Sequence, residues 1–312
     1  MKRPRGVIVF VPGKNPKPAA DVHRSWLLRA LLRGVELYDP QALAELKPHT
    51  DRFRLAAWNS IFYRREDPID REIPWIEELL HKTQASEADR RATNTWRIRV
   101  TRALYAFADR FPQFIALLPD RVVKETVKET RRYFYNHQGI GRAVREVLKN
   151  HLRTAFDRDE PVLLIAHSMG SVIAYDALWE LWFEDKRPQQ IDLFVTIGSP
   201  LGMDFVQRRL LGHGRRHDRM LPGNIKRWAN VAAHGDLTAL DPVLCDDFRP
   251  LLSSGFTEYI KDYTDVYTYY RNAAGLNFHR SYGYLAHPLL GELVTRWWRS
   301  LADISRSKST VE

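Results

Sequence analysis

Apolar residues along the chain fall into short continuous runs that alternate with segments of helical spacing. The continuous runs have the length of buried strands and cover residues 6–11, 53–58, 162–165, 191–199 and 225–233. Helical spacing is clearest over residues 21–34, where Gly34 marks the predicted end, and over 141–156, 172–181 and 289–301. Strands that alternate with helices favour a parallel sheet with right-handed crossovers. We therefore predict an α/β fold with a mostly parallel central sheet flanked by helices.

Residues 64–135 interrupt this alternation. The stretch has no strand pattern, is rich in charged and aromatic residues, and contains four prolines. We predict that residues 1–63 and 136–312 form the core and that residues 64–135 form a helical insertion that caps it. The apolar residues between Phe107 and Leu118 either pack the insertion on the core or form a wall for an acyl chain. A second aromatic cluster, the tyrosines of residues 259–270, is interpreted as an amphipathic packing surface.

The turn between the third predicted strand and its helix carries the candidate chemistry. Its sequence is Ala166-His167-Ser168-Met169-Gly170. A sharp strand-to-helix turn strains the backbone of its central residue and requires small residues two positions before and after it. The amino end of the following helix also favours negative charge that develops there. The pattern predicts Ser168 as an exposed nucleophile; the alternative is a serine that caps an ordinary turn.

With its flanking strand and helix, this segment resembles the nucleophile elbow of the α/β-hydrolase superfamily, in particular its lipase- and esterase-like members. Alanine at position 166 stands where the family often has glycine. The resemblance implies that an acid and then a histidine follow the serine along the chain, as parts of a catalytic triad. Such a histidine acts as the base that activates the serine, and the acid orients it.

The segment from Trp228 to Val243 resembles the family's acid-bearing strand and loop, and counting from the tryptophan places Asp236 on the acid. Asp241 is the alternative, although an Asp-Pro pair more often starts a turn. The segment around His279, Asn-Phe-His-Arg-Ser-Tyr-Gly-Tyr, resembles the late loop that carries the base. His287 is the remaining histidine after the acid, but the proline behind it indicates the start of the terminal helix.

An acyl-transfer site also needs two N–H donors for the oxyanion. The backbone N–H of Met169, directly after the serine, is the first candidate. The second is expected on the loop after the first strand, at Lys14 or Asn15, because Gly13 lets the backbone approach closely. Pro12 stands where relatives often carry histidine.

Composition limits the other functions open to the chain. With 312 residues and 44% hydrophobic residues it can form a large core, and its single cysteine excludes an intrachain disulfide. No apolar run is long enough to cross a bilayer, so we expect a cytoplasmic protein. The net charge of +10 comes from interleaved acids and bases without a nucleic-acid motif, which excludes a nucleic-acid partner but leaves weak attraction to an anionic membrane surface open. His213 and His217 lack a third ligand, so no metal site is predicted.

Together these features predict a serine hydrolase that cleaves carboxylic esters through an acyl-enzyme, without a cofactor. Its expected substrate is a small-molecule or lipid-like acyl ester. A thioesterase or an acyltransferase would use the same residues, and a hydrolase fold without turnover would serve as a scaffold protein. The sequence leaves the acyl length, the leaving group and the oligomeric state open.

Overall fold

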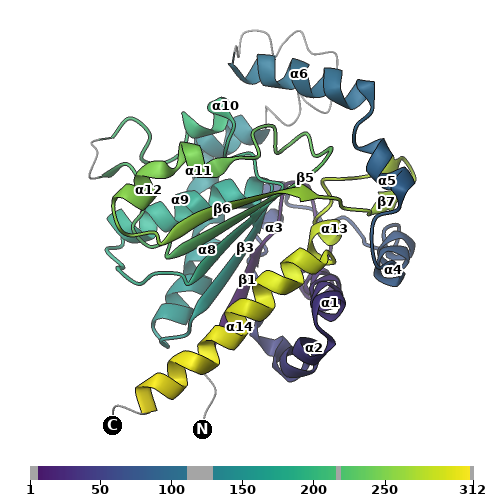
Figure 1. The fold of residues 1–312 in the computed structure, drawn as a ribbon. Coiled ribbons are helices and arrows are strands. Elements are labelled where there is room, and N and C mark those ends of the chain that lie inside the picture. Colours follow the sequence, from purple (N-terminus) through teal and green to yellow (C-terminus); the bar gives the residue numbers. More distant parts are fainter. Residues whose placement is uncertain (1–5, 111–128, 216–218, 310–312) are drawn as a thin grey trace.

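The computed structural model describes residues 6–110, 129–215 and 219–309. Six parallel strands form one sheet in the order β2-β1-β3-β4-β5-β6, with helices on both faces (Figure 1). The strands are β1 (Val7–Val11), β2 (Phe53–Leu55), β3 (Val162–His167), β4 (Leu193–Ile197), β5 (Arg227–Ala233) and β6 (Tyr259–Val266). The predicted α/β fold with a parallel, helix-flanked sheet is therefore confirmed.

The central strands explain the continuous apolar runs. Every residue of β1, β3 and β4 is buried, because helices cover both faces of the sheet. In β1, Val7 and Val9 belong to one hydrophobic core, whereas Ile8 and Phe10 belong to the other. One strand therefore supplies both cores with alternate side chains.

Two groups of helices complete these cores. On one face lie α3 (Asn59–Tyr63), α8 (Ile140–Phe156), α9 (Met169–Phe183), α11 (Leu244–Asp247) and α12 (Arg249–Ser253). On the other lie α1 (Ala20–Tyr38), α2 (Pro40–Leu46), α13 (Ser281–Leu285) and α14 (Pro288–Ser309). Shorter elements are the 3₁₀ helices η1 (Lys47–Arg52) and η3 (His137–Gly139), α10 (Asp204–Gln207) and the hairpin strands β7 (Arg271–Asn272) and β8 (Gly275–Leu276).

Two details differ from the sequence-based expectation. The edge strand β6 was not predicted, because half of its residues are exposed and it lacks a continuous apolar run. Gly34, predicted as the end of the first helix, lies inside α1, which continues to Tyr38. A Cβ at Gly34 would lie 2.4 Å from the carbonyl oxygen of Leu285, and one at Gly291 would lie 2.1 Å from that of Gly34. These glycines allow α1 to pack closely against the end of α13 and against α14.

The predicted insertion is helical where it is described. It contains α4 (Ile73–His81), α5 (Glu87–Ala92), α6 (Trp96–Arg110) and a helical segment over residues 129–134. Figure 1 shows α6 at the top of the view, beyond the sheet. Arg102 of α6 donates to the carbonyl oxygens of Ala239 and Leu240, in the loop after β5. Residues 111–118 and the side chain of Phe107 lie outside the described residues, so the apolar wall predicted there is not described.

None of the helices in the described part of the chain combines the length and the apolar character needed to cross a membrane.

Candidate active site

Ser168 occupies a strained turn between β3 and α9. Its backbone has φ +55° and ψ −129°, a conformation that few non-glycine residues adopt. The neighbours two positions away are constrained by packing. Ala166 is fully buried, and a Cβ at Gly170 would lie 2.5 Å from the carbonyl oxygen of Val11. The small residues that the sequence shows are thus the ones that this turn requires.

The structure brings Ser168, His279 and Asp236 together at the carboxyl ends of the strands. Ser168 Oγ lies 2.9 Å from His279 Nε2. Nδ1 of the same ring lies 3.0 Å from Asp236 Oδ1 and 2.9 Å from Oδ2. Asp241, the alternative acid, is exposed, and its carboxylate accepts a hydrogen bond from the Val243 N–H at the start of a turn. The geometry therefore favours Asp236 over Asp241 as the partner of His279.

Asp236 is held in its ionised form. Its carboxylate accepts hydrogen bonds from the Tyr284 hydroxyl at 2.7 Å and the Thr238 N–H at 2.8 Å, in addition to the His279 ring. Burial alone would raise the pKa of Asp236, but these donors and the nearby imidazole outweigh it and lower the pKa below its usual value. An ionised carboxylate at this position fixes the imidazole with its proton on Nδ1, so that Nε2 faces the serine as an acceptor.

Gly198 makes room for this pair and was missed by sequence reasoning. It follows β4, has φ +53°, and a Cβ there would lie 2.6 Å from Asp236 Oδ2 and 3.2 Å from His279 Nδ1. Any side chain at position 198 would collide with the carboxylate. The available signal was a glycine at the end of a buried strand, next to the elbow strand in the sheet.

His167 was also missed as a supporting residue. Its Nε2 donates to the carbonyl oxygen of His279 at 2.7 Å, so it anchors the backbone of the loop that carries the base. Burial, with the neighbouring His279 ring, lowers the pKa of His167 well below its usual value. His167 is therefore a neutral, structural donor. Its position beside Ser168 was the only signal in the sequence.

His287, the alternative base, lies elsewhere. Its Nδ1 accepts a hydrogen bond from the Leu289 N–H at 3.2 Å, and α14 begins at the next residue, Pro288. His287 thus caps the terminal helix, as the sequence indicated. Burial lowers its pKa to about 4, which keeps the ring neutral and able to accept this bond at neutral pH.

The two candidate oxyanion donors belong to segments next to the serine. Met169 is the first residue of α9, so its N–H has no acceptor within the helix. The loop that carries Lys14 packs against the elbow, because a Cβ at Gly13 would lie 3.0 Å from the Cβ of Ser168. The N–H of Asn15, the other candidate on this loop, donates to the Tyr63 hydroxyl at 2.9 Å. Lys14 is therefore the better candidate of the two.

Side chains around α3 hold this loop in place. Trp58 Nε1 donates to the carbonyl oxygen of Pro12 at 2.8 Å, and Asn59 Nδ2 donates to those of Gly13 and Asn15, both at 2.9 Å. Asn15 itself has a φ of +76°. The loop thus keeps a defined shape although Pro12 replaces the histidine of the expected pattern.

A narrow apolar slot is lined in part by Lys14 and Met169, the two residues that carry the candidate donors. Its free volume is about 10 Å³, close to the space that one water molecule occupies. Its lining consists of Lys14, Trp58, Phe62, Tyr63, Glu129, Thr130, Tyr133, Met169 and Ile173. The lining residues 129–133 come from the last part of the insertion. An acyl group next to Ser168 would thus meet aromatic and aliphatic side chains.

The predicted insertion also contacts the loop of His279, the candidate base. Arg280, directly after His279, forms an ion pair with Glu72 at the start of α4. At the other end of the site, Asp109 of α6 accepts hydrogen bonds from the N–H groups of Asp204 and Phe205, in the segment after β4. The insertion therefore contacts the segments that follow β4 and β5 and the loop of the base.

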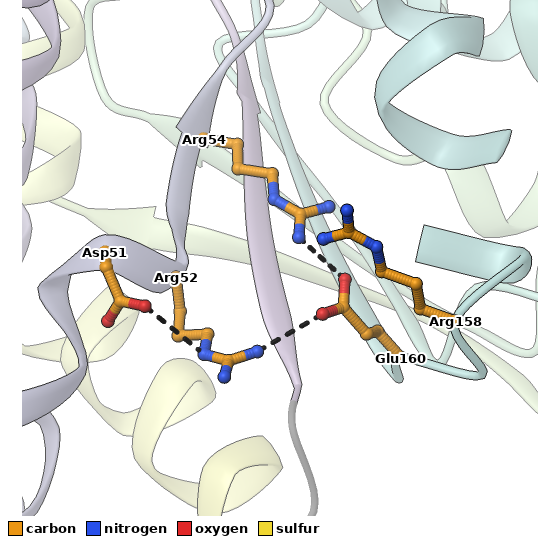
Figure 2. A pocket seen from close by; sticks show the side chains of 5 residues that line it. All are labelled: Asp51, Arg52, Arg54, Arg158 and Glu160. Atoms are coloured by element: carbon orange, nitrogen blue, oxygen red, sulfur yellow. Dashed lines mark hydrogen bonds and ion pairs between the residues drawn. The ribbon is translucent and has the colours of Figure 1, made fainter. Parts of the chain in front are cut away.

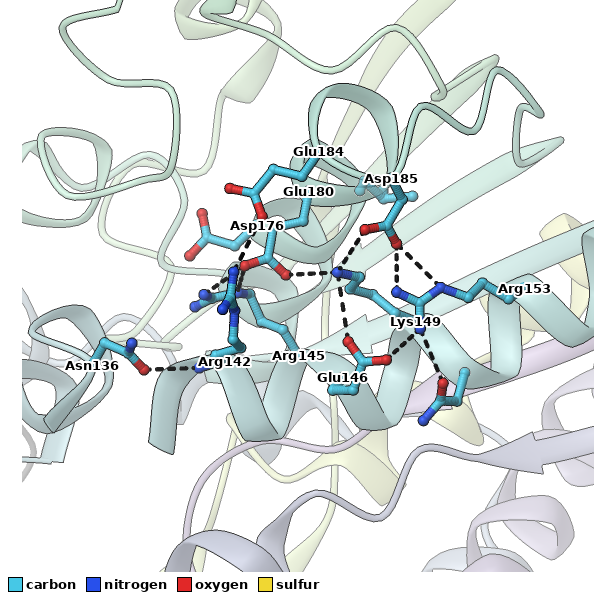
Figure 3. A network of polar contacts seen from close by, with 12 residues as sticks. Asn136, Arg142, Arg145, Glu146, Lys149, Arg153, Asp176, Glu180, Glu184 and Asp185 are labelled. Atoms are coloured by element: carbon cyan, nitrogen blue, oxygen red, sulfur yellow. Dashed lines mark hydrogen bonds and ion pairs between the residues drawn. The ribbon is translucent and has the colours of Figure 1, made fainter. Parts of the chain in front are cut away.

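A buried polar network fixes the helix behind the serine (Figure 3). Glu180 of α9 accepts from Arg145 at 2.9 Å and from Lys149 at 3.2 Å, both on α8. One turn earlier, Asp176 accepts from the Tyr133 hydroxyl at 2.8 Å, and burial raises its pKa to about 6. Both carboxylates belong to α9. Glu180 therefore holds this helix against α8, and Asp176 holds it against Tyr133 at the end of the insertion.

No group of three metal-ligating side chains occurs in the described part of the chain. His213 is described, but His217 is not, so the predicted absence of a metal site at this pair stays a prediction.

No protein-family model matches the chain, and neither a curated protein nor a solved structure does. Its function is therefore inferred from its own residues and their geometry.

Proposed function

We propose that this protein is a serine hydrolase of the α/β-hydrolase type that cleaves carboxylic esters, in the manner of carboxylesterases and lipases. One observation carries the proposal: Ser168 Oγ lies 2.9 Å from His279 Nε2, and the Nδ1 of that ring lies 2.9 Å from Asp236 Oδ2. A serine hydroxyl is a weak nucleophile at neutral pH and needs a base within hydrogen-bond reach, which an ionised acid must orient. The strained backbone of Ser168 supports the same role.

The reaction follows from these positions. Ser168 Oγ attacks the ester carbonyl carbon while its proton passes to His279 Nε2. The resulting imidazolium, stabilised by Asp236, gives this proton to the departing alcohol as the carbon–oxygen bond breaks and the acyl-enzyme forms. Water then attacks the acyl carbon, His279 accepts its proton, and the carboxylic acid leaves as Ser168 takes a proton back.

Charge on the carbonyl oxygen develops between the N–H groups of Met169 and Lys14 in this proposal. The amino end of α9 adds a favourable field at the same point. The adjacent apolar slot supports an acyl group of low polarity as the part of the substrate that binds there. Its small free volume favours short acyl chains.

We further propose that residues 64–135 form the cap of this enzyme. The contacts of α6 with the segments that follow β4 and β5 support this role, since the proposed catalytic residues lie at the same edge of the sheet. Thioesters and acyl transfer to an alcohol would require the same three side chains, so the leaving group and the acceptor must be found by assay.

A fluorophosphonate probe tests the proposal directly, because it phosphonylates an activated serine and needs no substrate. We expect stoichiometric labelling of the wild-type protein at Ser168, seen by peptide mass spectrometry, and no labelling of Ser168→Ala. Ser171→Ala is the matched control, since Ser171 is fully buried on α9 and its hydroxyl donates to the carbonyl oxygen of Ser168. A folded wild-type protein that resists labelling would refute the hydrolase and favour the scaffold alternative.

A further inference from the structure

A second cavity lies at the opposite edge of the sheet, near the amino ends of β2 and β3. Its volume is about 640 Å³, and all its lining residues are charged: Asp51, Arg52, Arg54, Arg158 and Glu160 (Figure 2). Arg52 ends η1, Arg54 lies in β2, and Arg158 and Glu160 belong to the turn between α8 and β3. Since Ser168 follows the carboxyl end of β3, this cavity is separate from the proposed catalytic site.

The arginines outnumber the acids in this cavity. Glu160 uses both carboxylate oxygens: Oε1 lies 3.2 Å from Arg52 Nη1, and Oε2 lies 2.7 Å from Arg54 Nη2. Asp51 lies 3.6 Å from Arg52 Nε, but its side chain is 73% exposed, so water screens this pair. Three guanidinium groups against two carboxylates leave the cavity with one excess positive charge.

Two of the guanidinium groups keep donors that the described residues do not use. Nη1 of Arg54 is buried and has no hydrogen-bond partner among the described residues, which is costly for a charged group. Arg158 is exposed and forms no ion pair with any described carboxylate. Both guanidinium groups line the same cavity, and Figure 2 shows that of Arg54, but not that of Arg158, joined to Glu160. Adjacent like charges repel, and an anion that contacts both would remove this repulsion.

We infer that this cavity binds a dianionic phosphate group. A guanidinium presents paired N–H donors that match two phosphate oxygens, and Arg158 and Arg52 approach the cavity from opposite walls. The lining has no apolar or aromatic residue, so it recognises the charged group and not a hydrophobic body attached to it. The phosphate of a small soluble ester and that of a lipid headgroup share this chemistry. The site does not depend on the proposed hydrolase activity.

Thermal unfolding in the presence of inorganic phosphate tests the inference. At constant ionic strength, set with sodium chloride, we expect the Tm of the full-length protein to rise with phosphate concentration, logarithmically once the concentration exceeds the Kd, because the ligand binds the folded state. Arg158→Gln removes an exposed side chain that forms no ion pair with a described carboxylate, so this variant is expected to fold and to bind phosphate about tenfold more weakly. Arg142→Gln is the matched control, since Arg142 is 70% exposed and lies near the opposite end of α8.

Glu160→Gln distinguishes a binding site from a structural ion-pair cluster. In a phosphate site the glutamate competes with the ligand, so its removal should strengthen phosphate binding several-fold even if the unliganded protein loses stability. If these residues form only a structural cluster of ion pairs that binds no ligand, phosphate should leave the Tm of every variant unchanged. If Glu160→Gln does not fold, the comparison of Arg158→Gln with Arg142→Gln decides alone.

Two further measurements identify the source of the phosphate. Glycerol 3-phosphate is titrated in solution, and phosphatidylcholine vesicles with and without phosphatidic acid are tested by flotation. Saturable binding of glycerol 3-phosphate that Arg158→Gln weakens supports a soluble ester. Flotation that requires phosphatidic acid and that Arg158→Gln reduces supports a lipid headgroup. Failure of inorganic phosphate, glycerol 3-phosphate and phosphatidic acid alike, or equal binding by wild type and Arg158→Gln, would overturn the inference.

Discussion

The hydroxyl of Tyr284 donates a 2.7 Å hydrogen bond to Asp236 Oδ2, the oxygen that lies 2.9 Å from His279 Nδ1. The same hydroxyl accepts the N–H of Ala233, so it joins the end of β5 to the carboxylate. In the proposed hydrolase, Tyr284 thus holds the orientation of Asp236 without contact to the reacting atoms, as a positioning residue.

Tyr284→Phe should lower kcat for p-nitrophenyl acetate about three- to tenfold and leave KM nearly unchanged. The lost hydrogen bond also raises the pKa of Asp236, so the acid limb of the kcat profile should move to higher pH. Tyr269→Phe is the control, because the buried Tyr269 hydroxyl has no hydrogen-bond partner among the described residues. Equal pH profiles for wild type and Tyr284→Phe would show that Tyr284 only packs against the site.

Gly198→Ala should damage both stability and catalysis. The new Cβ would lie 2.6 Å from Asp236 Oδ2, in a backbone with φ +53°. We expect a loss of about 2 kcal/mol in the free energy of unfolding and a fall in kcat of more than about tenfold. Gly255→Ala separates the two causes, since Gly255 has φ +75° and nothing lies within 4 Å of the position of its Cβ. It should lose stability and keep its kcat, as measured by urea unfolding and ester hydrolysis.

Asp236→Asn and Asp241→Asn should differ widely in activity. The first change removes the charge that stabilises the imidazolium and favours the wrong ring tautomer, so kcat should fall about 10²- to 10⁴-fold. The second change affects an exposed turn and should alter kcat less than about twofold. Steady-state kinetics with one p-nitrophenyl ester suffices. A larger loss in Asp241→Asn would reverse the assignment of the acid.

The slot lined by Met169, the residue after Ser168, should set the preferred acyl length. Ile173→Ala enlarges it, so activity should shift from p-nitrophenyl acetate towards butyrate and hexanoate, at a cost of about 2–4 kcal/mol in stability. Leu178→Ala is the matched control, because Leu178 is equally buried on α9 but does not line the slot. It should lose comparable stability and keep the wild-type preference in a panel from acetate to palmitate. The same preference in both variants would place the acyl group elsewhere.

Buried neutral histidines should make the protein sensitive to acid. Burial lowers the pKa of His287 in the folded protein to about 4, whereas in the unfolded chain it stays near 6.5. Between these values the unfolded chain binds more protons, so stability falls as the pH drops through this range. His287→Asn keeps an acceptor for the Leu289 N–H and does not titrate. Between pH 7 and 4, urea unfolding should show wild type losing up to about 3 kcal/mol more than this variant; equal losses would contradict the prediction.

The sequence predicted the parallel sheet and the residues that meet at its carboxyl edge, because both depend on local patterns. The sequence alone shows the continuous strands, the elbow around Ser168 and the order of Asp236 and His279 along the chain. Gly198 and Tyr284 are not, since their roles depend on contacts with a carboxylate that lies 38 and 48 residues away in the chain. β6 was not predicted because an edge strand needs only one buried face and therefore lacks a continuous apolar run.

Gly34 shows that a local sequence pattern can also predict a feature that contacts between distant elements overrule. A glycine after an amphipathic run usually ends a helix, and the local pattern favoured that interpretation. In the structure a Cβ at Gly34 would meet the carbonyl oxygens of Leu285 and His287, at the end of α13 and just before α14, so packing requires glycine and the helix continues. Such a requirement arises between elements more than 250 residues apart, where no local pattern can record it.

The hydroxyl of Tyr63 accepts the Asn15 N–H and donates to Glu129 of the insertion, at 3.2 Å. The Tyr63 hydroxyl therefore links the loop that carries Lys14 to Glu129, which lines the slot. In the proposed hydrolase, a substrate that displaced Glu129 would therefore also disturb the contact that holds the backbone beside Lys14.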